Sequence, residues 1–225
     1  MKAQPIYVFD AYGTLLDVNS AAARLADGIG PQWQQLSDIW RTKQLEYTWV
    51  HAASEQPATF WELTERSLDY ALAALRLDIA DETRAALLDL YRELDPYPEV
   101  GRVLAALKAQ GARLAILSNG DPDLLERVID SAGLDGVFDY VLSVAEARTF
   151  KPVPAVYRLA VEAFDAPPGD ITFLSSNRWD IAGACAFGFR TVWINRAGRP
   201  DEYPGLPPER IVATLDGLMD TAPSS

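Results

Sequence analysis

The stretch Ile6-Tyr7-Val8-Phe9-Asp10-Ala11-Tyr12-Gly13-Thr14 sets an acidic residue directly after a run of apolar ones. Four later stretches of the 225-residue chain are also nearly continuously apolar, at 114–117, 140–144, 171–174 and 191–194. Such runs are typical of strands buried on both faces of a parallel sheet, where the alternation of apolar and polar residues is lost. We therefore predict that residues 6–9 form a buried strand and that Asp10 stands at its carboxyl end.

Helical patterns separate most of these apolar runs. Apolar residues recur at helical spacing in the segments 100–110, 121–132 and 154–164. This alternation of helices with buried strands predicts an α/β fold with a doubly wound, mainly parallel, Rossmann-like sheet.

The interval 17–97 has a different pattern, because long helical periodicities fill it and no strand-like apolar run occurs. Three helices are predicted there, at 32–50, 58–77 and 81–94. We predict an all-helical cap domain at 17–97, inserted into a Rossmann-like catalytic core made of 1–16 and 98–225. An insertion directly after the first strand lies above the carboxyl ends of the strands, where open α/β sheets bind ligands.

Composition restricts the possible partners. Hydrophobic residues make up 49% of the chain, enough for a sizeable core, and the formal net charge is −12. An acidic chain without a basic patch is not suited to bind nucleic acid or an anionic membrane. No stretch reaches the roughly 18 to 20 apolar residues that span a bilayer, and the amino terminus lacks a signal-peptide pattern, so we expect a cytoplasmic protein. The single cysteine, Cys185, excludes an intrachain disulfide.

Polar side chains stand where the predicted strands end. Asp10 follows the first strand, Ser118 and Asn119 follow the second, Lys151 lies in the segment after the third, and the stretch 175–180 follows the fourth. Because the carboxyl ends of parallel strands lie side by side, we expect these groups to meet around one crevice. Each has a simpler explanation alone, since an aspartate after a strand often caps a helix and a lone lysine is usually solvated. Their coincidence favours an active site.

The order of these motifs resembles the haloacid dehalogenase superfamily. The matching motifs are Asp10-x-x-x-Thr14, Ser118-Asn119, Lys151-Pro152 and Ser175-Ser176-Asn177-x-x-Asp180. Two further stretches, Trp40-Arg41-x-x-Gln44-Leu45-Glu46-Tyr47-Thr48-Trp49 and Trp193-Ile194-Asn195-Arg196, resemble its L-2-haloacid dehalogenases of type II. The resemblance spans both sheet and cap, and it implies a hydrolase acting on carbon–halogen bonds, an (S)-2-haloacid dehalogenase.

The reaction that the resemblance implies is hydrolytic dehalogenation of short L-2-haloalkanoic acids to D-2-hydroxyacids with inversion. Asp10 attacks the halogen-bearing carbon and forms an ester, while Thr14 and Lys151 hold its carboxylate ionised and oriented. Asp180 and Ser175 then position or activate the water that hydrolyses this ester. The implied catalytic set is Asp10, Thr14, Lys151, Ser175, Asn177 and Asp180.

The resemblance also implies a site for the substrate and the departing halide. Its implied members are Ala11, Tyr12, Arg41, Phe60, Ser118, Asn119, Tyr157 and Trp179. Arg41, Asn119 and Phe60 receive the halide. Ser118 and the backbone N–H groups after Asp10 bind the substrate carboxylate. From the residues alone, solvation is the common outcome for a helix residue such as Arg41, and Phe60 is compatible with ordinary cap core. Tyr157 and Trp179 are equally compatible with helix packing.

The residue two positions after Asp10 separates two chemistries of the superfamily. Its phosphatases carry a second aspartate there, because a departing alkoxide needs a proton at neutral pH. A halide is a weak base and leaves unprotonated, so Tyr12 favours dehalogenation and can line an apolar pocket. Ser176 stands where the phosphatases have an acidic magnesium ligand, and Lys151 supplies positive charge instead. We expect no metal and no cofactor.

A magnesium-dependent small-molecule phosphatase of the same superfamily is the main alternative. A non-catalytic binding protein is disfavoured, because Asp10 and Asp180 are both present together with Lys151. The resemblance further implies a homodimer, although the apolar stripes of the cap helices are also compatible with burial inside one subunit. The halogen preference and the chain length of the substrate do not follow from the sequence.

Overall fold

A single parallel sheet forms the centre of the molecule. The computed structural model describes residues 4–219, and its six strands follow the order β3-β2-β1-β4-β5-β6, each parallel to its neighbours. The strands are β1 (Ile6–Phe9), β2 (Arg113–Ser118), β3 (Tyr140–Ser143), β4 (Ile171–Ser175), β5 (Arg190–Ile194) and β6 (Arg210–Val212). The α/β fold class predicted from the alternating pattern is confirmed.

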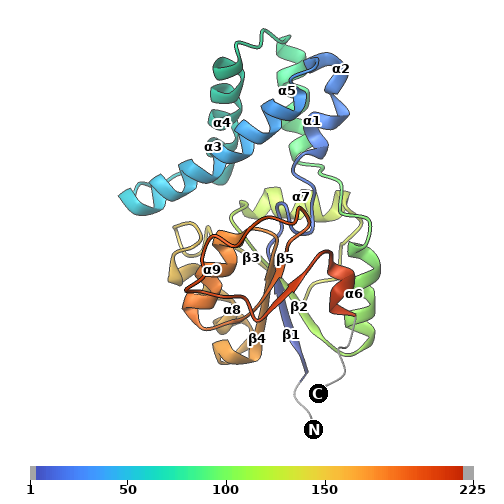
Figure 1. The fold of residues 1–225 in the computed structure, drawn as a ribbon, viewed down its shortest axis with the longest axis vertical. Coiled ribbons are helices and arrows are strands. Elements are labelled where there is room, and N and C mark those ends of the chain that lie inside the picture. The colour runs from blue at the N-terminus through green and yellow to red at the C-terminus, as the bar shows by residue number, and fades with distance from the viewer. Residues whose placement is uncertain (1–3, 220–225) are drawn as a thin grey trace.

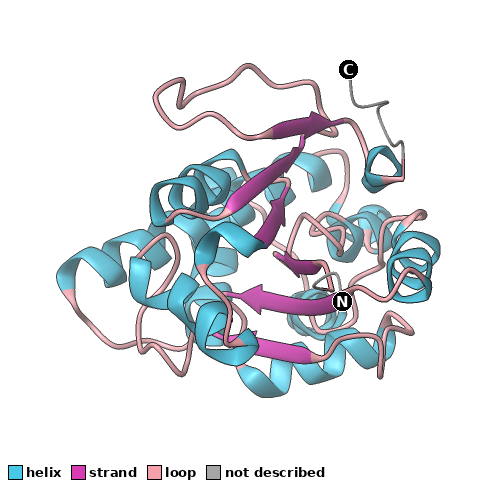
Figure 2. Cartoon of the chain, turned by 90° about the horizontal axis from the view of Figure 1, so that it is seen from below, coloured by secondary structure: helices cyan, strands magenta, loops and turns pink. Residues whose placement is uncertain are grey.

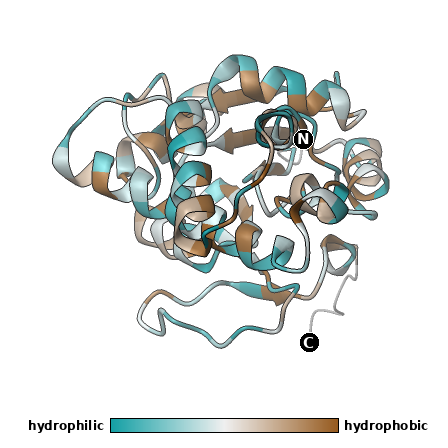
Figure 3. Cartoon of the chain, turned by 90° about the horizontal axis from the view of Figure 1, so that it is seen from above, coloured by the Kyte–Doolittle hydropathy of each residue, from teal (hydrophilic) through white to brown (hydrophobic). Residues whose placement is uncertain are grey.

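Helices cover both faces of this sheet, as Figure 2 shows. The helices that connect its strands are α6 (Val100–Ala109), α7 (Pro122–Ser131), α8 (Pro154–Phe164) and α9 (Arg178–Phe187). Between these layers, Val8, Phe9 and Phe173 are fully buried. Seen from above, the strands inside the sheet are coloured mainly as hydrophobic, whereas the helices around them alternate between hydrophobic and hydrophilic turns (Figure 3). Burial on both faces explains why the strands read as continuous apolar runs.

A group of helices stands above the sheet and follows β1 in the chain (Figure 1). It contains α1 (Ser20–Arg24), α2 (Ala26–Ile29), α3 (Trp33–Ser54), α4 (Phe60–Leu75) and α5 (Asp81–Tyr91). The chain enters and leaves this group side by side, because Leu16 forms an antiparallel bridge with Pro96. Tyr97 N also donates to Leu15 O at 3.0 Å. The helical group lies where the insertion was expected, and the domain boundaries at 17 and 97 stay a prediction.

The position of β1 in the sheet defines where a ligand can bind. β1 pairs with β2 on one side and with β4 on the other, so the chain winds outward in both directions from it. Such a switch point opens a crevice beyond the carboxyl ends of the central strands. The pairing with β4 reaches Asp10, whose backbone N–H donates to Leu174 O at 2.9 Å. Asp10 therefore projects into the crevice from a fixed backbone.

The helices α1 and α2 and the strand β6 are among the elements that were not predicted from the sequence. The two helices contain only five and four residues, which is too short for a helical period to stand out. β6 has three residues at the sheet edge, and its central residue Ile211 is 57% exposed, so no buried apolar run marks it.

Within residues 4–219, no helix combines the length and the hydropathy needed to cross a membrane.

Candidate active site

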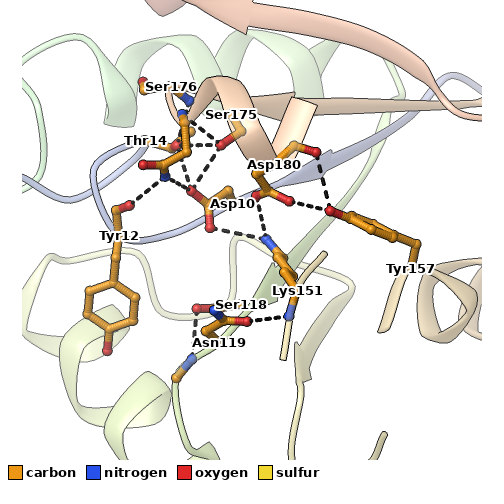
Figure 4. Close-up of polar contacts among 12 residues, drawn as sticks. Asp10, Tyr12, Thr14, Ser118, Asn119, Lys151, Tyr157, Ser175, Ser176 and Asp180 are labelled. Carbon is orange, nitrogen blue, oxygen red and sulfur yellow. Dashed lines mark hydrogen bonds and ion pairs between the residues drawn. The ribbon is translucent and has the colours of Figure 1, made fainter. Parts of the chain in front are cut away.

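The two carboxylate oxygens of Asp10 have different partners, as Figure 4 shows. Oδ2 accepts three hydrogen bonds, from Thr14 Oγ1 at 2.9 Å, Ser175 Oγ at 3.1 Å and Asn177 Nδ2 at 2.8 Å. Oδ1 accepts from Lys151 Nζ at 3.1 Å. Asp10 is buried, and these donors, which come from the end of β4 and from the segments after β1, β3 and β4, offset the cost of removing its charge from water.

Lys151 links the two carboxylates of the site. Its side chain is fully buried, and Nζ lies 3.1 Å from Asp10 Oδ1 and 2.8 Å from Asp180 Oδ2. Burial disfavours the ammonium form, but the neighbouring Asp10 and Asp180 outweigh it and raise the pKa of Lys151 above its ordinary value. Lys151 is therefore a permanent cation between two acidic groups.

Asp180 lies in the first turn of α9 and is fully buried. Burial raises the pKa of Asp180 to about 6, against the opposing effect of the Lys151 ammonium. Tyr157 OH donates to Asp180 Oδ1 at 2.8 Å. Burial also raises the pKa of Tyr157 well above its ordinary value, so the phenol keeps its proton and remains a donor. Asp180 is thus a carboxylate that takes up a proton more readily than a solvated aspartate.

The turn after β2 supports Lys151 from the other side. Asn119 Oδ1 accepts from the backbone N–H of Lys151 at 3.0 Å, which fixes the main chain of the lysine. Ser118 Oγ accepts from Gly120 N at 3.1 Å and closes the turn. Both side chains are buried next to the crevice. The turn residues predicted from the sequence therefore stand beside Lys151.

Two residues of the helical group reach the loop after β1 from above. Arg41 on α3 donates through Nη2 to Tyr12 O at 3.1 Å. Phe60, the first residue of α4, is 1% exposed, and its ring centroid lies 5.2 Å from that of Tyr12. Tyr12 also stacks on Tyr91 of α5, with ring centroids 5.7 Å apart. The predicted halide residues Arg41 and Phe60 thus converge on Tyr12.

The remaining predicted residues, Ala11 and Trp179, border the site. Ala11 is fully buried, and its carbonyl accepts from Leu15 N at 2.9 Å within the tight loop after β1. Trp179 packs edge-on against Trp49 of α3, with ring centroids 5.5 Å apart. It also lines a cavity of about 440 Å³ together with Arg41 and Asn177. This cavity lies between α3 and the loops after β4 and β5, directly beside the Asp10 cluster.

The sequence did not predict Gln44 as part of the site. Its Oε1 accepts from Arg41 Nη1 at 2.7 Å and from Tyr91 OH at 3.0 Å. Gln44 is buried, and it lies three residues after Arg41, so both side chains share one face of α3. That spacing was a signal in the sequence for a residue that orients the guanidinium.

The two carboxylates of the site are paired with an ammonium group. A magnesium ion binds oxygen ligands, mainly carboxylates, whereas the Lys151 ammonium contacts both carboxylates here. Among residues 4–219, no three His, Cys, Asp or Glu side chains are grouped as metal ligands. The buried Ser176 Oγ, at the position of the acidic ligand in phosphatases, is neutral and has no hydrogen-bond partner in this part of the chain.

Three comparisons with known proteins agree with each other. Residues 5–188 match the model of the haloacid dehalogenase-like hydrolase family. (S)-2-haloacid dehalogenase 1 of Pseudomonas sp. (strain CBS-3) is 44% identical over 211 residues, which cover 94% of this chain and 93% of that protein. A crystal structure of a dehalogenase has a TM-score of 0.95 at 40% identity, over 100% of both chains. The L-2-haloacid dehalogenase of Xanthobacter autotrophicus with chloropropionic acid covalently bound has a TM-score of 0.85 at 33% identity, over 98% of this chain and 100% of that one.

The family model covers the strands β1 to β4 together with the helical group, and the curated relative covers nearly the whole chain. Among the motifs that suggested the family from sequence, the side chains of Asp10, Thr14, Lys151, Asn177 and Asp180 meet in the crevice. The chain therefore belongs to the haloacid dehalogenase-like hydrolases and, within them, to the (S)-2-haloacid dehalogenases.

Proposed function

We propose that this hydrolase converts short (S)-2-haloalkanoic acids to (R)-2-hydroxyacids, with inversion, through an ester on Asp10 and without a metal. The observation that supports this proposal most directly is the asymmetry of the Asp10 carboxylate, with three donors on Oδ2 and the Lys151 ammonium on Oδ1. Such a carboxylate is oriented for attack through one oxygen.

Oδ1 is the attacking atom in this proposal. The three donors on Oδ2 leave that oxygen few free lone pairs, whereas Oδ1 has a single partner among the described residues. Oδ1 bonds to the carbon that carries the halogen, the carbon–halogen bond breaks, and the halide departs with the bonding electron pair on the opposite side. Back-side attack inverts the carbon.

Oδ2 then becomes the carbonyl oxygen of the ester. Water adds to Cγ, negative charge collects on Oδ2, and the bond between Cγ and Oδ1 breaks to release the hydroxyacid. Thr14, Ser175 and Asn177 already donate to Oδ2, so they stabilise this charge without rearrangement. The same three donors serve the carboxylate and the tetrahedral intermediate.

Asp180 accepts the proton of the attacking water. With a pKa of about 6 it is ionised at neutral pH and still a stronger base than a solvated aspartate. Lys151 holds it in place at 2.8 Å. Asp180 then passes this proton to the departing alkoxide oxygen, and the other water proton, left on the Asp10 carboxyl, passes to solvent, which restores both carboxylates.

The departing halide needs hydrogen-bond donors and the positive edge of an aromatic ring rather than an acid. The Arg41 guanidinium and the Phe60 ring both lie at Tyr12, two residues from the nucleophile, and supply these. The Tyr12 phenol is itself buried without a hydrogen-bond partner among the described residues, and burial raises its pKa well above the ordinary value. A phenol with so high a pKa is a poor proton donor. A halide is a weakly basic leaving group and needs no proton donor.

The comparisons support this chemistry in two ways. The relatives are named for haloacid dehalogenation, and the Xanthobacter autotrophicus enzyme holds chloropropionic acid covalently. A covalent adduct in a protein of the same family supports the proposed ester. The homodimer and the cytoplasmic location stay predictions.

The deciding experiment measures halide release from (S)-2-chloropropionate and from its enantiomer in excess chelator. We expect chloride and (R)-lactate from the (S) acid only, at a rate that the chelator leaves unchanged. A single turnover with excess enzyme in ¹⁸O-water should place the label in the enzyme rather than in the first product. Phosphate release from p-nitrophenyl phosphate with added magnesium, together with no halide release, would instead identify a phosphatase.

A further inference from the structure

The amino-terminal end of α4 receives acceptors from two parts of the molecule. Inside the helical group, Thr59 and Glu62 form a capping box, with Thr59 Oγ1 accepting from Glu62 N at 3.1 Å. From the core, Asp121 accepts from Phe60 N at 3.1 Å and from Trp61 N at 2.8 Å. These first-turn N–H groups have no partner inside a helix. The segment after β2 therefore holds the end of a helix that lies far from it in sequence.

Asp121 does not perform the task that its position suggests. It is the N-cap residue of α7, where an aspartate usually accepts from the N–H groups of its own helix. Its side chain makes no such bond to α7, which begins with Pro122. Replacing Asp121 therefore releases α4 without removing a side-chain cap from α7.

The backbone of Asp121 is fixed to the turn of the active site. The preceding residue, Gly120, donates through N to Ser118 Oγ and accepts at O from Ser143 Oγ at 2.7 Å. A Cβ atom on Gly120 would lie 3.0 Å from the Tyr12 ring. The turn thus packs directly on Tyr12, and Asp121 moves with the sheet rather than with the helical group.

The helix end that Asp121 holds begins with Phe60. Its ring is 1% exposed and lies against Tyr12, with centroids 5.2 Å apart. Phe60 N is one of the two donors to Asp121. Asp121 therefore holds the same residue whose ring faces the site.

We propose that Asp121 is a positioning residue that holds the Phe60 ring where the halide departs. The role rests on the proposed function, in which Phe60 receives the halide, and Asp121 acts only through Phe60. Negative charge on the halogen grows during cleavage of the carbon–halogen bond. A displaced ring therefore stabilises the transition state less, whereas substrate binding changes little. The loss is larger for chloride than for bromide, since chloride is the poorer leaving group.

The test compares D121A and D121N with T59A as a matched control. T59A also removes an acceptor from the first turn of α4 but leaves the bonds to the core intact. The quantity is the ratio of kcat/KM for (S)-2-bromopropionate to that for (S)-2-chloropropionate, because kcat/KM reports the step that releases halide. We expect D121A to raise this ratio about five- to ten-fold, which is a difference of about 1 kcal/mol between the two activation free energies. D121N keeps one acceptor oxygen, so its ratio should lie between those of the wild type and D121A. T59A should keep the wild-type ratio.

An equal ratio in D121A, T59A and the wild type would overturn the proposal, since Asp121 would then be an ordinary cap. If D121A does not fold, D121N has nearly the same size and is judged by the same ratio. A wild-type chain that releases no halide at all would refute the proposed function and this role with it. Normal halide release with an unchanged ratio refutes the role of Asp121 alone.

Discussion

At the scale of single residues, the site is organised by what surrounds each oxygen of Asp10. Ser175 Oγ both donates to Oδ2 and accepts from Asn177 N at 3.0 Å, so it links the nucleophile to the loop after β4. The Oγ of the neighbouring Ser176 is buried and has no hydrogen-bond partner among the described residues. The two serines therefore form a matched pair for mutation.

We expect Ser175→Ala to lower kcat about 10²- to 10³-fold, because one donor to the oxyanion of the intermediate is lost. Ester hydrolysis should suffer more than ester formation, so mass spectrometry of the quenched enzyme should detect accumulated ester on Asp10. Ser176→Ala is the control and should keep nearly the wild-type kcat. Equal kcat values for the two variants would rule out the oxyanion role of Ser175.

The pKa of Asp180, about 6, predicts an acid limb in the rate of ester hydrolysis. The base must be ionised, so kcat should fall as the pH drops through about 6 and stay level above it. The hydrogen bond from Tyr157 lowers the pKa of Asp180, so its loss in Tyr157→Phe should move this limb to higher pH. The check is the pH profile of kcat for both proteins, and an unmoved limb in the variant would contradict the assignment.

At the scale of elements, the packing of α8 against α9 places Tyr157 on Asp180. A Cβ atom on Gly183, in the middle of α9, would contact the Tyr157 hydroxyl and lie 2.6 Å from Pro152 Cβ. Both neighbours belong to the segment that begins at Lys151, so the close approach of α9 to this segment depends on the missing side chain.

Gly183→Ala should destabilise the fold by about 1–3 kcal/mol, the usual effect of overpacking, and reduce kcat by displacing Tyr157 from Asp180. Gly101→Ala is the control, since Gly101 lies in α6, exposed and with open space around it. Alanine is the better helix former, so this control should be stabilised, by up to about 1 kcal/mol. Thermal unfolding and kcat of both variants test the difference; similar effects of the two changes would refute the packing role.

At the scale of the whole molecule, core and helical group share one hydrophobic interior. One cluster of buried hydrophobic residues contains Leu36 and Trp40 of α3, Phe60 of α4, and Phe173 of the sheet. Tyr12, in the loop after β1, is buried and packs on Phe60 and Tyr91 of the helical group. Unfolding the helical group alone would expose this loop to water.

We therefore expect thermal unfolding in a single transition, with equal calorimetric and van't Hoff enthalpies. Near-ultraviolet circular dichroism should follow the same curve as the far-ultraviolet signal, since the tryptophans lie in both parts of the molecule. Two separate calorimetric transitions would show that the cap folds independently and would contradict the shared interior.

Local patterns were enough to predict most of the elements. The strand at 6–9 was predicted with the bounds it has, because burial on both faces leaves an uninterrupted apolar run. β6 was missed, because an exposed edge strand of three residues carries no such run. Asp121 was placed at the start of a helix, where it lies, but its side chain binds a different helix, which no local pattern indicates.

The sequence by itself determined the alternation of strands and helices, the place of the helical insertion and the set of polar residues at the strand ends. These follow from hydrophobic periodicity, which depends on neighbours within a few residues. The tertiary structure alone decided which oxygen of Asp10 takes three donors, that Lys151 lies between Asp10 and Asp180, and that Asp121 holds α4. Those contacts join residues distant in the chain, and sub-ångström differences in packing select among the partners available to each polar group.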